Sequence, residues 1–147
     1  MMERHGLEHY RAILESISPE TLQRYDREES GGQFDGMGEC EQAGGAFTFS
    51  ALTLDEQAAI LQAIGNFLPT KTKRVNKDAG TSYAIKHAIE RYTGRYTSNL
   101  QAKVAFRVLG YQRGGLHDLN PHFNISRREW RTFSELSRII ANRRAKR

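Results

Sequence analysis

The sequence has little of what stabilises or anchors many small proteins. Its single cysteine, Cys40, excludes an internal disulfide and is typical of a protein in a reducing cytoplasm. No stretch approaches the roughly 20 apolar residues of a membrane helix. Residues 1–14 carry charges throughout and lack the apolar segment of a signal peptide. A cytoplasmic protein without a membrane partner is therefore expected, and 147 residues are enough to bury a core by apolar packing alone.

Motifs that would carry catalysis or hold a metal are also missing. There is no phosphate-cradling Gly-Lys-Ser/Thr loop, no nucleophile elbow and no CxxC pair. His5 and His9 stand four residues apart, but no third ligand follows at a telling spacing. His87 and Glu90 form a weak ligand pattern, since Lys86 and Glu90 make a more ordinary helical pair. The sequence therefore predicts a non-enzymatic protein that needs no cofactor and no metal.

Charge, in contrast, is abundant and unevenly placed. Residues 1–70 contain 4 Lys/Arg against 12 Asp/Glu, a net charge of −8, whereas residues 71–147 contain 18 against 5, a net charge of +13. This asymmetry indicates two surfaces with different partners, or an acidic segment that screens a basic one. The alternative is that acidic helices dock on basic helices within one fold.

The apolar pattern predicts a mainly α, small helical domain with at most a minor two-stranded β element. Residues 4–17 have the spacing of an amphipathic helix, and Ser18-Pro19 begins a second helix that continues to about Arg27. Residues 30–46 contain six glycines and predict a linker or mobile loop. We expect 1–46 to form an acidic helical segment with its linker, and 47–147 to form a basic helical domain.

Four more helices are expected in the second part of the chain. A capping box at Thr53-Leu54-Asp55-Glu56 begins a helix that ends near Pro69, and a second such box lies at Ser126-Arg127-Arg128-Glu129. Between them, one helix begins after Thr81 or Ser82 and ends at Gly94, and another runs from Ser98 to Gly110. Short strands are expected at 47–49 and 123–125. The core face of the last helix is predicted to hold Trp130, Phe133, Leu136, Ser137 and Ile140.

The helix pair within residues 81–111 is joined by a short turn and resembles a helix-turn-helix unit. Its second helix would read a nucleic acid with an outward face of Asn99, Lys103, Phe106 and Arg107. Lys103 and Arg107 stand four apart, so a nearby polyanion would relieve their mutual repulsion. Phe106 between them would stack on a base or contact a partner. The alternative is that Phe106 belongs to the core and the two cations are a solvated face.

Further basic residues extend this predicted surface. Arg95 lies in the turn before the second helix, where Ser98 and the first backbone amides either cap the helix or receive a phosphate. Arginine dominates in the last helix, and its guanidinium fork binds phosphates, although a solvated basic helix is the alternative. Loop lysines would position the nucleic acid without reading its sequence. The predicted nucleic-acid-binding residues are Lys71, Lys73, Arg74, Lys77, Arg95, Asn99, Lys103, Phe106, Arg107, Arg127, Arg131 and Arg138.

One pattern of residue types lies within residues 52–128. It consists of Thr81-Ser82-Tyr83, Lys86-His87, Glu90, Gly94, Tyr96, Ser98-Asn99, Gly110-Tyr111 and Phe123-Asn124-Ile125-Ser126. This pattern resembles a group of small proteins carried by phages and plasmids. The resemblance implies an origin in a mobile element. Proteins of this kind and size commonly bind DNA in replication or regulation, or inhibit a host defence complex such as a CRISPR effector.

The sequence thus favours a non-enzymatic mobile-element protein that binds DNA or RNA through a basic helical face. The alternative is an anti-CRISPR-like inhibitor that binds a host nucleoprotein complex and also uses its acidic half. A third hypothesis is a homodimeric interaction module with Phe106 or Trp130 in the subunit contact.

Overall fold

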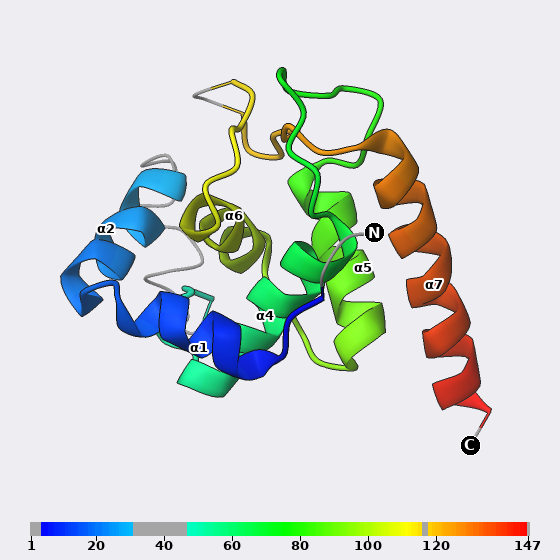
Figure 1. Ribbon diagram of the computed structural model, residues 1–147, viewed down its shortest axis with the longest axis horizontal. Coiled ribbons are helices and arrows are strands. Elements are labelled where there is room, and N and C mark those ends of the chain that lie inside the picture. The colour runs from blue at the N-terminus through cyan, green and yellow to red at the C-terminus, as the bar shows by residue number, and fades with distance from the viewer. Residues whose placement is uncertain (1–3, 31–46, 116–117, 147) are drawn as a thin grey trace.

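A computed structural model describes residues 4–30, 47–115 and 118–146, and its described part is mainly α-helical (Figure 1). The helices are α1 (Leu7–Glu15), α2 (Pro19–Glu29), α4 (Leu54–Phe67), α5 (Ser82–Thr93), α6 (Asn99–Val108) and α7 (Arg127–Ala145). Cys40 and the glycine-rich segment predicted as a linker lie outside the described residues, apart from Ser30 at the end of α2. None of the helices in the described ranges is long and apolar enough to cross a membrane.

The helices pack around two central elements, α4 and α6. Helix α4 contacts α1, α5, α6 and α7, while α6 contacts α2, α4 and α5. Helix α7 packs mainly along α5, so much of its surface remains exposed at one side of the molecule (Figure 1). A helix surrounded on several sides is expected to be buried over most of its circumference. For this reason most residues on α6 are buried.

Local capping signals set most of the helix ends. The hydroxyl of Ser18 accepts from the backbone N–H of Thr21, and Pro19 follows at the first helical position. Thr53 and Glu56 form the predicted capping box of α4. Gly94 ends α5 with φ = 76°, a left-handed conformation that favours glycine. The strand predicted at 47–49 is wrong, because Phe49 is held in a turn by a hydrogen bond from its N–H to Asp26 Oδ1.

Three loops gather at the end of the molecule where α5 and α7 begin. Residues 121–126 form isolated antiparallel bridges with both neighbouring loops, pairing Lys71 with Ile125, Thr81 with His122 and Arg113 with Phe123. The side chain of Asn124 joins the loops, since its Nδ2 donates to the carbonyl of Thr72 and its Oδ1 accepts from the N–H of Gln112. Isolated bridges replace the predicted strand at 123–125, and they fix the basic loop before α5 against the start of α7.

Candidate nucleic-acid interface

The predicted outward face of α6 is not a surface. Lys103 is 3% exposed, and its Nζ donates to the carbonyl of Leu119 at 3.2 Å. Phe106 is fully buried and stacks on Phe123 with ring centroids 4.0 Å apart. This expectation failed because segments distant in the chain cover α6, including the 118–126 segment. Phe106 is therefore a core residue, which removes it both as a base-stacking side chain and as a subunit contact.

The other residues predicted on α6 are also occupied within the protein. Arg107 lies 2.7 Å from Glu28 and 3.4 Å from Glu29, with its guanidinium 4.1 Å from the centre of the Tyr25 ring. The Nδ2 of Asn99 donates to the carbonyl of Leu119 and to Asn120 Oδ1. Helix α6 thus serves as a structural helix, and the structure does not confirm a helix-turn-helix unit.

The start of α6 is capped and does not form an open phosphate site. Ser98 is buried, its hydroxyl accepts from the N–H of Gln101, and the side chain of Gln101 accepts from the N–H of Ser98. The same hydroxyl donates to the carbonyl of Phe47 at 2.7 Å. Capping is therefore the correct one of the two interpretations of this turn.

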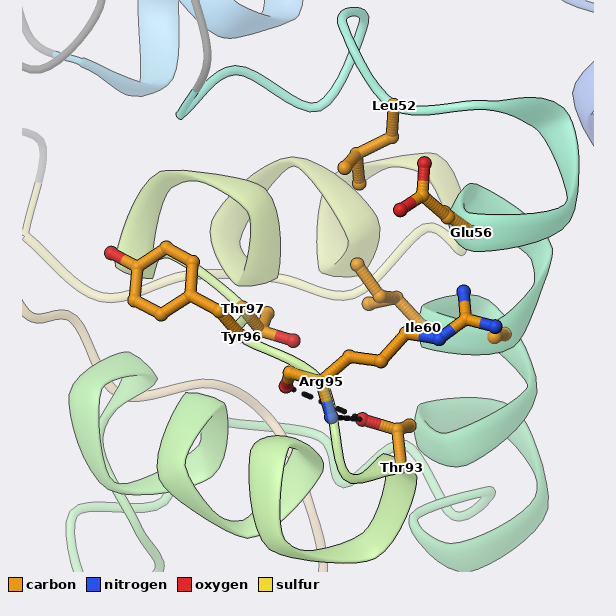
Figure 2. Close-up of a pocket in the computed structure, with 8 residues that line it drawn as sticks. Leu52, Glu56, Ile60, Thr93, Arg95, Tyr96 and Thr97 are labelled. Atoms are coloured by element: carbon orange, nitrogen blue, oxygen red, sulfur yellow. Dashed lines mark hydrogen bonds between the residues drawn. The ribbon is translucent and has the colours of Figure 1, made fainter. Parts of the chain in front are cut away.

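Arg95 lies beside a small hollow between α4 and the turn after α5 (Figure 2). Its side chain runs across the hollow toward α4 (Figure 2). Hydrogen bonds with Thr53 are the main cause of the lowered pKa of Glu56, and the positive charge of Arg95 lowers it further. The hollow has a volume of ≈ 20 Å³, room for about one water molecule. Arg95 is exposed, and its charge lies near that of Glu56, although the two form no ion pair within the described residues.

The loop of residues 70–80 is exposed and firmly anchored. The carboxylate of Glu129 accepts hydrogen bonds from the backbone N–H and the hydroxyl of Thr70, at 3.0 and 2.6 Å. Ser126 does cap α7, but this use of Glu129 replaces the predicted reciprocal half of a capping box. Asn76 donates to the carbonyl of Ile125 at 3.1 Å. The loop is therefore held against the first turn of α7, the turn that carries Arg127.

The cations of this loop are exposed, but one of them is occupied within the protein. The Nζ of Lys71 donates to the carbonyl of Leu109 and lies 4.9 Å from the centre of the Tyr111 ring. Lys73, Arg74 and Lys77 are exposed, and none forms an ion pair within the described ranges.

Arginines continue this surface along α7. Arg127, Arg131 and Arg138 are exposed and follow one another at spacings of four and seven residues, which places them on one side of the helix. None has an ion pair among the residues that the structure describes. Arg91 of α5 donates from Nε to the Ser137 hydroxyl at 3.0 Å. Burial lowers the pKa of Arg91, and the charge of nearby Arg138 lowers it further.

We call these residues the open basic face: Lys73, Arg74, Lys77, Arg127, Arg131 and Arg138. The anchored loop that carries Lys73, Arg74 and Lys77 lies beside the start of α7, and the other three residues follow along that helix (Figure 1). Six exposed like charges repel one another, and their repulsion falls when a polyanion neutralises them. The arrangement is suited to binding several successive phosphates.

An aromatic group on α5 and the turn after it was not predicted from the sequence as a binding site. Tyr83 and Tyr96 are 51% and 59% exposed, and Lys86 Nζ lies 5.5 and 5.1 Å from their ring centres. His87 meets the Tyr83 ring edge-on, with centroids 4.5 Å apart. Tyr83, His87 and Glu90 have a spacing that places them on one side of a helix, which could have indicated the group. Aromatic residues at such spacing are usually buried, however, and their exposure is seen only in the structure. We call Tyr83, Lys86, His87 and Tyr96 the aromatic cluster.

No metal centre accompanies these surfaces in the part of the chain that the structure describes, where no group of three or more His, Cys, Asp or Glu residues is placed to hold an ion. His5 and His9 stack face to face, with centroids 3.8 Å apart.

Comparison of the chain with models of protein families, with curated proteins and with solved structures found no match.

Proposed function

We propose that the protein binds nucleic acid through the open basic face, as a binding protein without catalytic activity. One observation carries the proposal: six exposed Lys and Arg side chains stand on the 70–80 loop and on α7, against whose first turn that loop is held, and none forms an ion pair among the described residues. Acidic residues hold several other cations of the chain, including Arg11, Lys86 and Arg107. A concentration of exposed positive charge on neighbouring elements favours a polyanionic ligand.

The proposed binding depends on the charge of the phosphates and not on the base sequence. Phosphate contacts from Lys and Arg fix the position of a nucleic acid without distinguishing its bases. The helix expected to enter a groove, α6, is covered by other parts of the chain, and Lys103 and Phe106 on it are buried. We therefore expect binding that varies little between sequences. A mobile-element origin is proposed on the resemblance alone.

The test is the salt dependence of binding to labelled oligonucleotides, followed by fluorescence anisotropy. Each neutralised phosphate contributes a slope of about −0.9 for duplex DNA, or about −0.7 for a single strand, in a plot of log affinity against log salt. Arg131→Glu with Arg138→Glu should weaken binding more than about tenfold, because each charge-assisted contact is worth about 1.5 kcal/mol or more.

A matched control separates this surface from net charge alone. Arg24 and Arg27 are exposed on α2, away from the open basic face. Arg24→Glu with Arg27→Glu changes the net charge by the same amount and should weaken binding less than about threefold, through the general field alone. Equal losses from the two double variants would contradict the proposal.

The second hypothesis, an inhibitor of a host nucleoprotein, is separated by a pull-down from host lysate with and without nuclease. A protein partner retained after nuclease treatment, together with no affinity for naked nucleic acid, would support the inhibitor and overturn direct binding. Loss of all partners on nuclease treatment would support direct binding.

A further inference from the structure

The aromatic cluster lies on α5 and the turn after it, and α5 packs along α7. Glu90 Oε1 is 2.7 Å from Lys86 Nζ and 3.4 Å from His87 Nδ1. Arg91, one helical turn after His87, donates from Nε to the hydroxyl of Ser137, the residue before Arg138, at 3.0 Å. The side of α5 that carries His87 and Arg91 therefore leads from the aromatic cluster to the helix that carries the exposed arginines.

The rings of the two tyrosines are exposed to solvent and are not packed into the core. More than half of the surface of each residue is accessible, although apolar rings of this size contribute strongly to a core when buried. The shared ammonium of Lys86 fixes both rings, at distances typical of cation–π contacts. Tyr96 also meets the ring of Phe47 edge-on, with centroids 5.7 Å apart. Fixed, exposed rings lose little conformational entropy when another flat group stacks on them.

The charge next to the rings selects the kind of flat group. Glu90 is neutralised by Lys86, and the neighbouring α7 contributes exposed arginines. A partner that combines flat rings with closely spaced negative charge is a nucleic acid. In a duplex the base faces are covered by stacking, so only unpaired bases offer a ring face to a tyrosine.

We propose that the aromatic cluster is a stacking platform for unpaired bases, and that the preferred ligand is single-stranded nucleic acid whose phosphates contact the open basic face. This inference rests on the proposed function and specifies its substrate class. Base–aromatic stacking tolerates any base, which agrees with binding that does not read sequence. The ring hydroxyls are not needed for it, whereas the ring faces are.

The experiment compares a single-stranded oligo-dT, an oligo-U of equal length and a hairpin duplex, all labelled, with the full chain at one low salt concentration. The wild-type protein should bind both single strands more tightly than the duplex. Tyr83→Ala and Tyr96→Ala should each weaken single-strand binding by about fivefold to a hundredfold, the range of stacking on one aromatic residue. Both should change duplex binding less than about twofold.

Two controls exclude a purely structural effect. Tyr83→Phe and Tyr96→Phe keep the rings and should retain single-strand affinity within about twofold. Leu54→Ala, which truncates an exposed apolar side chain on α4, should leave affinity unchanged. Thermal unfolding of every variant shows whether the fold is kept.

The outcomes separate this inference from the proposed function. Duplex binding that equals or exceeds single-strand binding would overturn the platform and leave the open basic face in place. The platform is also wrong if the alanine variants stay folded and bind single strands like the wild type, the result expected if these tyrosines contact a protein. Absence of binding to all three probes at low salt would overturn both proposals.

Discussion

Two groups of cations, both predicted from the sequence to bind nucleic acid, have different surroundings in the fold. Lys103 and Arg107 on α6 are held by a backbone carbonyl and by acidic residues of α2. Arg131 and Arg138 on α7 are exposed, with no ion pair inside the described ranges. Each group consists of basic residues that share one side of a helix, so their surroundings decide which cations remain available to a partner.

The difference also explains part of the uneven charge along the chain. Glu29 of α2 is 6% exposed and lies 2.7 Å from Arg113 as well as 3.4 Å from Arg107. Acidic residues from the N-terminal half thus neutralise cations from the C-terminal half inside one fold, as one of the sequence interpretations held. Exposed cations without an ion pair among the described residues remain on the 70–80 loop and α7, as well as at Arg27 of α2 and at Arg95.

The largest expected effect on stability comes from removing an acidic partner of the paired cations. Glu29→Ala should lower the free energy of unfolding by about 3 kcal/mol, because it leaves two guanidinium groups without their buried partner. This is the low end of the range for such a change, since Arg113 keeps carbonyl acceptors at Gly115 and Asp118 and Arg107 keeps Glu28. Urea unfolding followed by circular dichroism measures it.

Glu28→Ala is the matched control for that change. Glu28 is exposed and contacts the same Arg107, so its loss should cost less than about 1 kcal/mol. If the two variants were equally stable, the cations of α6 would not be held by a buried carboxylate, and the contrast between the two groups would disappear.

A smaller effect is expected where the open group is anchored. Glu129→Ala removes both hydrogen bonds to Thr70 and should cost about 1.5–3 kcal/mol, the range for bonds to a charged group. Thr70→Val keeps the backbone bond to the same carboxylate and should cost less. Hydrogen exchange of the 70–80 amides would report the freed loop. Unchanged protection in Glu129→Ala would show that the bridges to 121–126 hold the loop alone.

How far the sequence predicts this molecule depends on the range of each interaction. The caps at Ser18, Thr53 and Gly94 are correct because their partners lie within a few residues. The capping box at Ser126 is half correct, since Glu129 turns instead to Thr70, 59 residues away.

The faces of α6 were assigned wrongly for the same reason. Its pattern of apolar residues leaves Lys103 outside, but the carbonyl of Leu119 and the ring of Phe123 come from a later segment that covers the helix. The local sequence of α6 cannot predict that a later segment covers the helix. Arg127, Arg131 and Arg138 were placed correctly on one side because α7 lies at the edge, where helical spacing alone decides exposure.

The smallest expected effect on stability falls on the open group, and it is the sharpest test of the comparison. Arg131→Ala and Arg138→Ala should each change the free energy of unfolding by less than about 0.5 kcal/mol, because an exposed side chain without a partner contributes little to the folded state. Arg138→Ala should even be slightly stabilising, since it removes a like charge beside Arg91. Each should also reduce the salt slope of nucleic-acid binding by about one. A loss of stability above about 1 kcal/mol would show that these arginines hold the fold together like those of α6, and that the distinction between the two groups is false.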